Sequence, residues 1–419
     1  MPQADPRRTA LTVLAIAFGL NFAGRGLVES FVVFVLPLSQ SFGWDRAAVV
    51  SIQSFAMLAT GLFAPLAGRI YDRSGPRAVY GLGLGLIGAG MSLAPFANAL
   101  WQFQLCLGLA VGTGAACLGN APNSALVSRW FRKRLTLAMG VLWSAAGIGI
   151  LVLVPLAQFL VAEGGWRSAY HLLGGLALLG LVLVLLLPWR VYAPGAPAPD
   201  APAPDAPAPD AQVRSAAPAA AAGDAGWTLA RAMRQPAFWG LFCVFLFTSV
   251  GVSGTVVQVV AYLVEIGFPP LEAATAWGFG GLLLPAGMIG FSWLDGKVGR
   301  LPSIFLSYAL SMSGIVLLWL LGRHPSPWLL GAAVLLFGGT AGSRGPLIST
   351  VAMQLFRGPS VGTIFGTISI GAGLGAALGS WVGGLLHDWS GGYDLVFACA
   401  FASLLCGQLP FWLIPALRR

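Results

Sequence analysis

The sequence predicts an all-α membrane protein with twelve transmembrane helices in two similar six-helix bundles. Three observations predict this fold. The 419 residues are 57% hydrophobic and only 9% charged, with a mean hydropathy of +0.81. Apolar stretches of about 20 residues, the length that spans a bilayer, recur along the chain. Two short motifs appear once in each half of the chain, six apolar stretches apart.

The predicted spans follow one another with short polar breaks between them. They cover residues 11–38, 47–68, 78–97, 101–127, 135–160 and 168–188, and then 238–264, 273–293, 302–322, 327–353, 359–386 and 394–416. The first span is too long for a cleavable signal and holds Arg25 and Glu29 in its middle. The tenth contains the glycine-rich stretch 338–346, which predicts a locally broken helix.

A low-complexity segment divides the chain. Residues 191–235 contain Ala-Pro-Ala-Pro-Asp three times in succession, a sequence that favours extended conformations and cannot bury a core. Phe131-Arg132, after the fourth span, recurs as Phe356-Arg357 after the tenth, which indicates a duplication. We therefore expect bundles at 1–190 and 236–419, joined by a disordered cytoplasmic linker at 191–235.

Positive charge is distributed unevenly about the predicted spans. Most of the 23 lysines and arginines flank the side that holds both termini. Because basic residues favour the cytoplasmic side, both termini are predicted to be cytoplasmic, in a bacterial inner membrane. The net charge of +9 is therefore explained by topology, and no nucleic-acid partner is expected.

Each half carries an aspartate motif after its second span. The motif residues are Gly68, Asp72, Arg73, Gly75 and Arg77 in the first half, and Asp295 and Arg300 in the second. Glycine lets the chain turn, and a carboxylate can accept hydrogen bonds from the first amides of a helix. The two loops are predicted to hold helices together on the cytoplasmic side and to release them when the protein changes state. The alternative is that their charges only fix topology.

These motifs resemble those of a known family. The segment 68–77 resembles the signature loop between helices two and three of the major facilitator superfamily, and 295–300 lies where that superfamily has its second copy. Residues 129–140 and the glycines of 362–375 resemble monocarboxylate transporters and oxalate:formate antiporters. The resemblance covers essentially the whole chain. It implies a central cavity lined by helices one, four, seven and ten, and alternating access by rocking of the two halves.

Charged residues inside apolar spans identify the predicted binding site, because such residues are rare and usually functional. Arg25 in span one and Arg344 in span ten are predicted to bind a carboxylate, whose geometry matches the guanidinium fork. Glu29, one helical turn after Arg25, is predicted to neutralise Arg25 in the empty site and to couple transport to protons. A permanent Arg25–Glu29 ion pair that only holds helix one is the alternative. The charges that the resembling families carry in helices eight and eleven are not found inside spans 273–293 and 359–386.

Neutral polar residues are predicted to complete the site. They are Asn120 and Asn123 in span four and Gln258 and Tyr262 in span seven. Each has an alternative role as a contact between helices. The three histidines share no ligand spacing, so neither a metal nor a cofactor is expected.

These features together predict a secondary active transporter of small organic anions, in particular monocarboxylates, rather than an enzyme. It would act as a monomer, by proton symport or by exchange with a counter-anion. The alternative is a proton-coupled exporter of drug-like or cationic compounds, with Glu29 as the counter-ion. A transporter-like sensor or a membrane enzyme is disfavoured, because the sequence offers neither a further domain nor a nucleophile–base pair.

Overall fold

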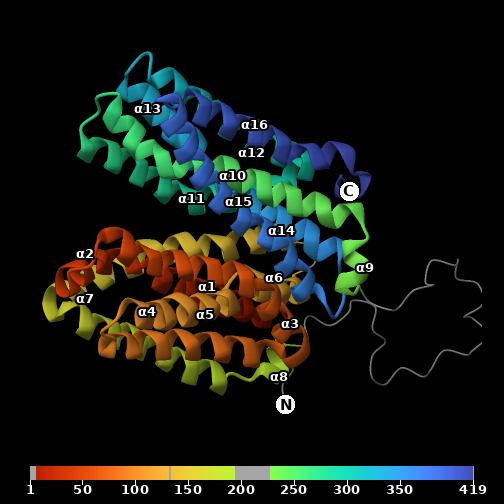
Figure 1. The fold of residues 1–419 in the computed structure, drawn as a ribbon. Coiled ribbons are helices and arrows are strands. Elements are labelled where there is room, and N and C mark those ends of the chain that lie inside the picture. Colours follow the sequence, from red (N-terminus) through yellow and green to blue (C-terminus); the bar gives the residue numbers. More distant parts are fainter. Residues whose placement is uncertain (1–5, 132–133, 194–226, 419) are drawn as a thin grey trace, which may run out of the picture.

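The computed structural model describes residues 6–131, 134–193 and 227–418, and the regular elements in these ranges are all helical. The predicted all-α class is therefore confirmed. Figure 1 shows two bundles side by side, one built from α1–α8 and the other from α9–α16. Both chain ends, α8 and α9 lie at one end of the molecule, which we call the terminal end. The helices α2 and α13 lie at the opposite end, which we call the far end.

The helices of the first half are α1 (Pro6–Glu29), α2 (Phe31–Phe42), α3 (Arg46–Leu93), α4 (Leu100–Phe103), α5 (Val111–Leu118), α6 (Asn120–Trp130), α7 (Leu135–Leu186) and α8 (Trp189–Tyr192). Those of the second half are α9 (Leu229–Met233), α10 (Pro236–Glu265), α11 (Pro270–Val298), α12 (Arg300–Leu321), α13 (Pro327–Ala333), α14 (Arg344–Leu355), α15 (Val361–Ser390) and α16 (Asp394–Leu413).

Nine helical segments of the described chain are long and apolar enough to cross a membrane. Two of them, Ala48–Phe96 and Leu135–Leu186, have 49 and 52 residues, about twice the length of one span. Each contains one non-helical glycine, Gly75 or Gly165, at the point where two predicted spans meet. The tenth predicted span appears as a shorter apolar helix, Pro327–Gly338, followed by α14. Every predicted span thus has a helical counterpart, although the number of separate helices differs.

Both aspartate motifs contain a glycine that turns the chain. Gly75 has φ 78° and ψ 178°, and Gly299 has φ 92° and ψ 167°. This region of the φ/ψ map is essentially restricted to glycine. The predicted loop at 68–77 is therefore helical up to Gly75, and a single residue makes the turn.

The two halves meet closely through small residues. A Cβ atom on Gly68 of α3 would lie 2.2 Å from the carbonyl oxygen of Gly362 in α15. A Cβ on Gly140 of α7 would lie 2.4 Å from Oγ of Ser292 in α11. Small side chains allow membrane helices this approach. The contacts lie near the first turns of α15 and α7.

The predicted linker at 191–235 is only partly described. Residues 194–226 lie outside the described residues. On its flanks, Trp130 Nε1 donates a hydrogen bond to the carbonyl oxygen of Tyr192 (2.7 Å), and Arg129 donates to that of Ala193 (3.1 Å). Thr228 caps α9. The predicted disorder therefore does not apply to residues 191–193 and 227–235, because side-chain contacts and short helices order them.

Candidate functional site

Arg25 and Glu29 form an ion pair on α1, with 2.7 Å between Nη2 and Oε1. The pair lies within an apolar segment, Arg7–Phe42, that is long enough to cross a membrane. Yet 47% of the Arg25 side chain and 21% of the Glu29 side chain are exposed. Because hydrocarbon strongly disfavours a charge, we expect the exposed part of this ion pair to face water rather than lipid.

The neighbours of α1 fix the direction in which Arg25 points. A Cβ on Gly24 would lie 2.8 Å from Cβ of Leu118 in α5, and a Cβ on Gly26 would lie 2.6 Å from the carbonyl oxygen of Gly149 in α7. Successive helical residues are about 100° apart, so Leu27 projects between these two helices and Arg25 points to neither of them. Leu27, on the opposite side of α1, is buried with 2% exposure. Arg25 therefore points away from the core of the first half.

Asn21 lies one turn before Arg25, and the sequence analysis missed it. Its Nδ2 donates hydrogen bonds to Oδ1 of Asn120 (3.0 Å) and to the carbonyl oxygen of Leu142 (2.9 Å). These two bonds join α1 to α6 and α7. The signal that could have found Asn21 is its spacing, since residues 21, 25 and 29 fall on one helical face.

This polar face of α1 borders the contact between the two halves. Trp143, the residue after Leu142, stacks on Phe245 of α10 with 6.4 Å between ring centroids and 9° between planes. A Cβ on Gly345 of α14 would lie 2.3 Å from the Trp143 ring. The carbonyl that holds Asn21 is thus one residue from a contact with the second half.

The fourth span is interrupted beside this face. Gly119, with φ −78° and ψ −169°, separates α5 from α6, which begins at Asn120. Asn123 is fully buried and donates from Nδ2 to the carbonyl oxygen of Leu118 (2.6 Å). Asn123 therefore bridges the interruption, whereas Asn120 is partly exposed. Of the two predicted site residues, Asn120 is the one that bonds to α1, at Asn21, one turn before Arg25.

The tenth span is interrupted in a similar way, as its glycine-rich stretch predicts. A π-helical turn ends at Gly338, and α14 begins at Arg344. Two hydroxyl pairs tie this interruption to α12. They are Ser343 with Ser307 (2.6 Å) and Thr340 with Ser311 (2.5 Å).

Arg344 is 1% exposed and turns into the second half. Its Nη1 donates to Ser311 Oγ (2.9 Å) and to both the hydroxyl and carbonyl oxygens of Ser307 (3.2 Å each). The guanidinium carbon lies 4.7 Å from the ring centroid of Tyr308. All of these partners belong to α12. The structure therefore does not place Arg344 face to face with Arg25, because the hydroxyls of α12 take up its guanidinium.

Arg344 is also a cation without a counter-charge. No carboxylate forms an ion pair with it in the ranges that the structure describes. Its Nε is buried and has no hydrogen-bond partner there. A lone interior charge is unfavourable for stability, which makes a functional role for Arg344 the first hypothesis.

The two predicted residues of α10 point to helices of their own half. Tyr262 is 4% exposed and donates its hydroxyl to the carbonyl oxygen of Leu318 (2.5 Å). Gln258 is partly exposed, and its Nε2 would lie 3.6 Å from a Cβ on Gly384 of α15. Tyr262 thus makes the helix-to-helix contact that the sequence analysis gave as its alternative role.

Asp72 joins the two halves at the terminal end. Its Oδ1 accepts a hydrogen bond from the amide of Gly362 (3.1 Å), and its Oδ2 accepts from the amide and the hydroxyl of Thr363 (2.7 Å each). These are among the first amides of α15, which have no partner within their helix. We call these contacts the Asp72 latch. The neighbouring Arg73 and Arg77 are exposed.

Asp295 makes no corresponding contact. Its Oδ1 is buried and has no hydrogen-bond partner among the described residues. Arg300, from the same motif, donates from Nη2 to Oε1 of Gln354 in α14 (2.5 Å). Arg300 therefore bonds to a helix of its own half, whereas Asp72 bonds across to the other half.

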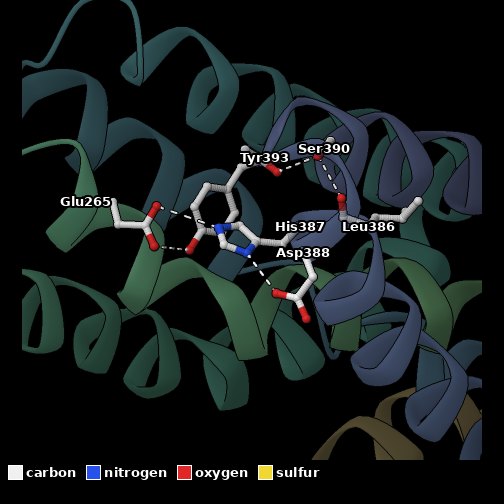
Figure 2. A network of polar contacts seen from close by, with 7 residues as sticks. Glu265, Leu386, His387, Asp388, Ser390 and Tyr393 are labelled. Carbon is white, nitrogen blue, oxygen red and sulfur yellow. Dashed lines mark hydrogen bonds and ion pairs between the residues drawn. The ribbon is translucent and has the colours of Figure 1, made fainter.

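A second polar cluster connects α10, α15 and the start of α16 (Figure 2). Tyr393 donates its hydroxyl to Oε1 of Glu265 (3.0 Å). His387 lies 3.7 Å from Oε2 of Glu265 through Nε2 and 3.5 Å from Oδ1 of Asp388 through Nδ1. Burial, and then the neighbouring Glu265, raise the pKa of Tyr393 to about 12, so this phenol stays a donor.

Two helical halves that meet beside charged and polar residues in their spans define a multi-pass membrane transporter. The family model of the Major Facilitator Superfamily matches residues 14–343. The chain belongs to this superfamily, which is a transporter family and not an enzyme family.

Comparisons with individual proteins agree. Monocarboxylate transporter 13 of Bos taurus is 27% identical over 91% of this chain and 84% of that protein. The uncharacterized MFS-type transporter YcxA of Bacillus subtilis (strain 168) is 25% identical over 93% of this chain and 90% of that protein. Among solved structures, the proton:xylose symporter XylE bound to 6-bromo-6-deoxy-D-glucose has a TM-score of 0.72 at 13% identity, with 98% of this chain and 96% of that chain covered. At this identity the structural match shows the fold alone.

Proposed function

We propose that this protein is a secondary active transporter of small organic anions, in particular monocarboxylates, and that Arg25 binds the carboxylate. The observation that carries the proposal is the exposure of 47% of the Arg25 side chain inside an apolar span, one helical turn after Asn21. Relatives named monocarboxylate transporters support the substrate class. The bundles would be residues 1–190 and 236–419, in a bacterial inner membrane with both termini cytoplasmic.

The relative exposure of the ion pair favours an anion over a cation. Arg25 exposes 47% of its side chain and Glu29 exposes 21%. An incoming solute therefore reaches the guanidinium more easily than the carboxylate. Export of a cationic compound, with Glu29 as its counter-ion, would favour the reverse order.

The ion pair supplies a mechanism for coupling. A substrate carboxylate matches the Arg25 guanidinium in a bidentate geometry and competes with Glu29 for it. The displaced Glu29 then takes a proton in a symport cycle, or re-forms its pair when the substrate leaves in an exchange cycle. The unneutralised charge of Arg344, whose neighbour Gly345 meets Trp143 of the first half, adds positive potential to the same path.

Rocking of the two halves would expose the site alternately to each side of the membrane. The Asp72 latch and the close approach of Gly68 to Gly362 support a state that is closed at the terminal end. Release of this latch would open the path there. Asp295 and Arg300, the motif residues of the second half, would serve the opposite state.

The test uses three ligands of nearly equal size, which are propionate, propionamide and propylamine. A ligand that binds the folded state raises the melting temperature of the purified protein. We expect propionate to do so and the neutral and cationic ligands not to. Counterflow of propionate in proteoliposomes then establishes transport, and Arg25→Gln should abolish it while the protein stays folded. Stabilisation by propylamine, or wild-type counterflow by Arg25→Gln, would refute the proposal.

Glu29→Gln separates the two modes of coupling. In a symporter this variant should still exchange propionate but should not accumulate it along a proton gradient. In an exchanger that uses no proton, accumulation by the wild-type protein should itself be independent of the gradient. The wild-type protein and the variant therefore distinguish the two modes in one flux assay.

A further inference from the structure

We propose that Asn21 fixes the orientation of the Asn120 amide, so that the site beside Arg25 presents hydrogen-bond donors and no acceptor from Asn120. This inference rests on the proposed function, because it explains how the same site would select a carboxylate. Asn21 is 3% exposed and belongs to α1, and Asn120 is the first residue of α6.

The orientation follows from a chain of hydrogen bonds that begins at a backbone carbonyl. The carbonyl oxygen of Leu142 can only accept a hydrogen bond, so the group of Asn21 that lies 2.9 Å from it is the amide nitrogen. The second N–H of the same nitrogen points to Asn120, at 3.0 Å. Asn120 must therefore present its oxygen to Asn21, and its own nitrogen faces the other way.

The nitrogen of Asn120 is then free to bind a ligand. No hydrogen-bond partner of Asn120 Nδ2 is found in the described part of the chain, and the residue is partly exposed. Asn21 and Arg25 stand one turn apart on the same face of α1. Because Asn120 is held against Asn21, it borders α1 one helical turn before Arg25.

Two donors, from Asn120 and from Arg25 one turn along α1, would match the acceptors of a carboxylate that reaches both. An ionised carboxylate has acceptor oxygens only, whereas a primary amide of the same size must also place a donor. A site of this kind binds the carboxylate and leaves the N–H groups of the amide without a partner. Asn120 is thus a ligand-binding residue, and Asn21 is a positioning residue that acts through it.

The experiment is a double-mutant cycle on the purified full-length protein, with propionate and propionamide as probes. Asn120→Leu removes the donor and should weaken propionate binding about tenfold or more. Asn21→Asp places an acceptor next to Asn120 and forces its amide to rotate. This variant should weaken propionate binding and shift the propionate-to-propionamide affinity ratio towards the amide.

The double variant Asn21→Asp/Asn120→Leu controls for the negative charge that Asn21→Asp adds. Asn21→Asp brings a carboxyl group near Arg25, which weakens anion binding whatever Asn120 does. The proposal requires that Asn21→Asp has a larger effect when residue 120 is Asn than when it is Leu. Equal effects in the two backgrounds would overturn the positioning role of Asn21.

Two further results complete the test. If Asn21→Asp does not fold, Asn21→Leu leaves the Asn120 amide free to take both orientations, and propionate affinity should fall about twofold. Wild-type affinity in that variant would contradict the inference. If the wild-type protein does not bind propionate at all, the proposed function fails. If it binds but Asn120→Leu has no effect, this inference alone fails.

Discussion

Asn120 and Arg344 occupy equivalent places in the two halves, yet their side chains point in different directions. Each is the first residue of a helix that follows an interruption, and each stands two residues before a proline. Asn120 is partly exposed and bonds to α1, whereas Arg344 is buried and bonds to α12. Both halves thus contain the broken helix, but the polar residue that begins the helix after the break has a different role in each half. The accessible cation, Arg25, comes from the first half.

The two aspartate motifs are also similar in sequence and different in their contacts. Asp72 and Asp295 each precede a glycine with positive φ. Asp72 accepts three hydrogen bonds from the start of α15 in the other half, while Oδ1 of Asp295 has no partner in the part of the chain that the structure describes. Two similar sequences thus produce one contact between the halves, and this contact favours one of the two states that the proposed alternating access requires.

The largest effect, a loss of transport, is expected from substitution of Arg344. Arg344→Met removes an interior charge that has no carboxylate partner among the described residues, so the melting temperature should stay the same or rise. Counterflow of propionate should nevertheless be lost if this charge supplies potential to the path, and Arg344→Lys should retain part of it. Wild-type counterflow by Arg344→Met would instead make this residue a structural support of the interrupted helix.

The next largest effect, on the stability of the closed terminal end, is expected where α3 and α15 approach closely. A Cβ on Gly68 would meet the backbone of Gly362, so Gly68→Ala must push the halves apart and should destabilise the closed terminal end by about 1–3 kcal/mol. Gly61→Ala is the matched control on the same helix, because a Cβ there has no neighbour within 4 Å. Hydrogen exchange of the amides at 361–366 should be faster in Gly68→Ala and unchanged in Gly61→Ala. Equal exchange in both variants would contradict the tight contact.

Weakening the Asp72 latch should destabilise the closed terminal end somewhat less than Gly68→Ala does. Asp72→Asn keeps an acceptor oxygen but removes the charge that strengthens its bonds to the first amides of α15. We expect a loss of about 1–2 kcal/mol, which corresponds to about a 5- to 30-fold increase in opening. Hydrogen exchange at Gly362 and Thr363 measures it directly. Asp295→Asn should leave these two amides unchanged, and a change of similar size there would remove the asymmetry between the motifs.

The sequence predicted the fold well because the bilayer imposes a strong pattern on composition. The length of the apolar stretches, the interruption at 338–346 and the repeated motifs all correspond to features of the structure. The number of separate helices was harder to predict. Near Gly75 the helix continues through the charged stretch 69–74, which the sequence marks as a break between spans, and the chain turns only at the glycine.

The site was less predictable, because direction and partners depend on tertiary packing. The sequence identified Arg25, Glu29 and Arg344 as charges within spans, and the spacing of four residues predicted the Arg25–Glu29 pair. It could not tell that the serines of α12 would take up the Arg344 guanidinium, since these lie more than 30 residues away. The role of Asn21 also escaped it, because a buried asparagine is informative only once its partners are known.

The smallest effect, on the free energy of unfolding, is expected from a change in the polar cluster around Tyr393. Tyr393→Phe removes one hydrogen bond to Glu265 and should lower the free energy of unfolding by about 0.5–1.5 kcal/mol. Because the folded state raises the pKa of Tyr393 to about 12, its contribution should be constant from pH 6 to pH 9 and should decline from about pH 10 to pH 12. In the first half, Trp166 donates to Ser41 Oγ (3.0 Å), a bond between groups that do not titrate in this range. Chemical denaturation at a series of pH values should therefore show an alkaline loss of stability that Tyr393→Phe reduces and Trp166→Phe leaves in place. If the alkaline loss of stability is equally large in Tyr393→Phe, the Tyr393 phenol is not its cause, and the second half does not differ from the first in this respect.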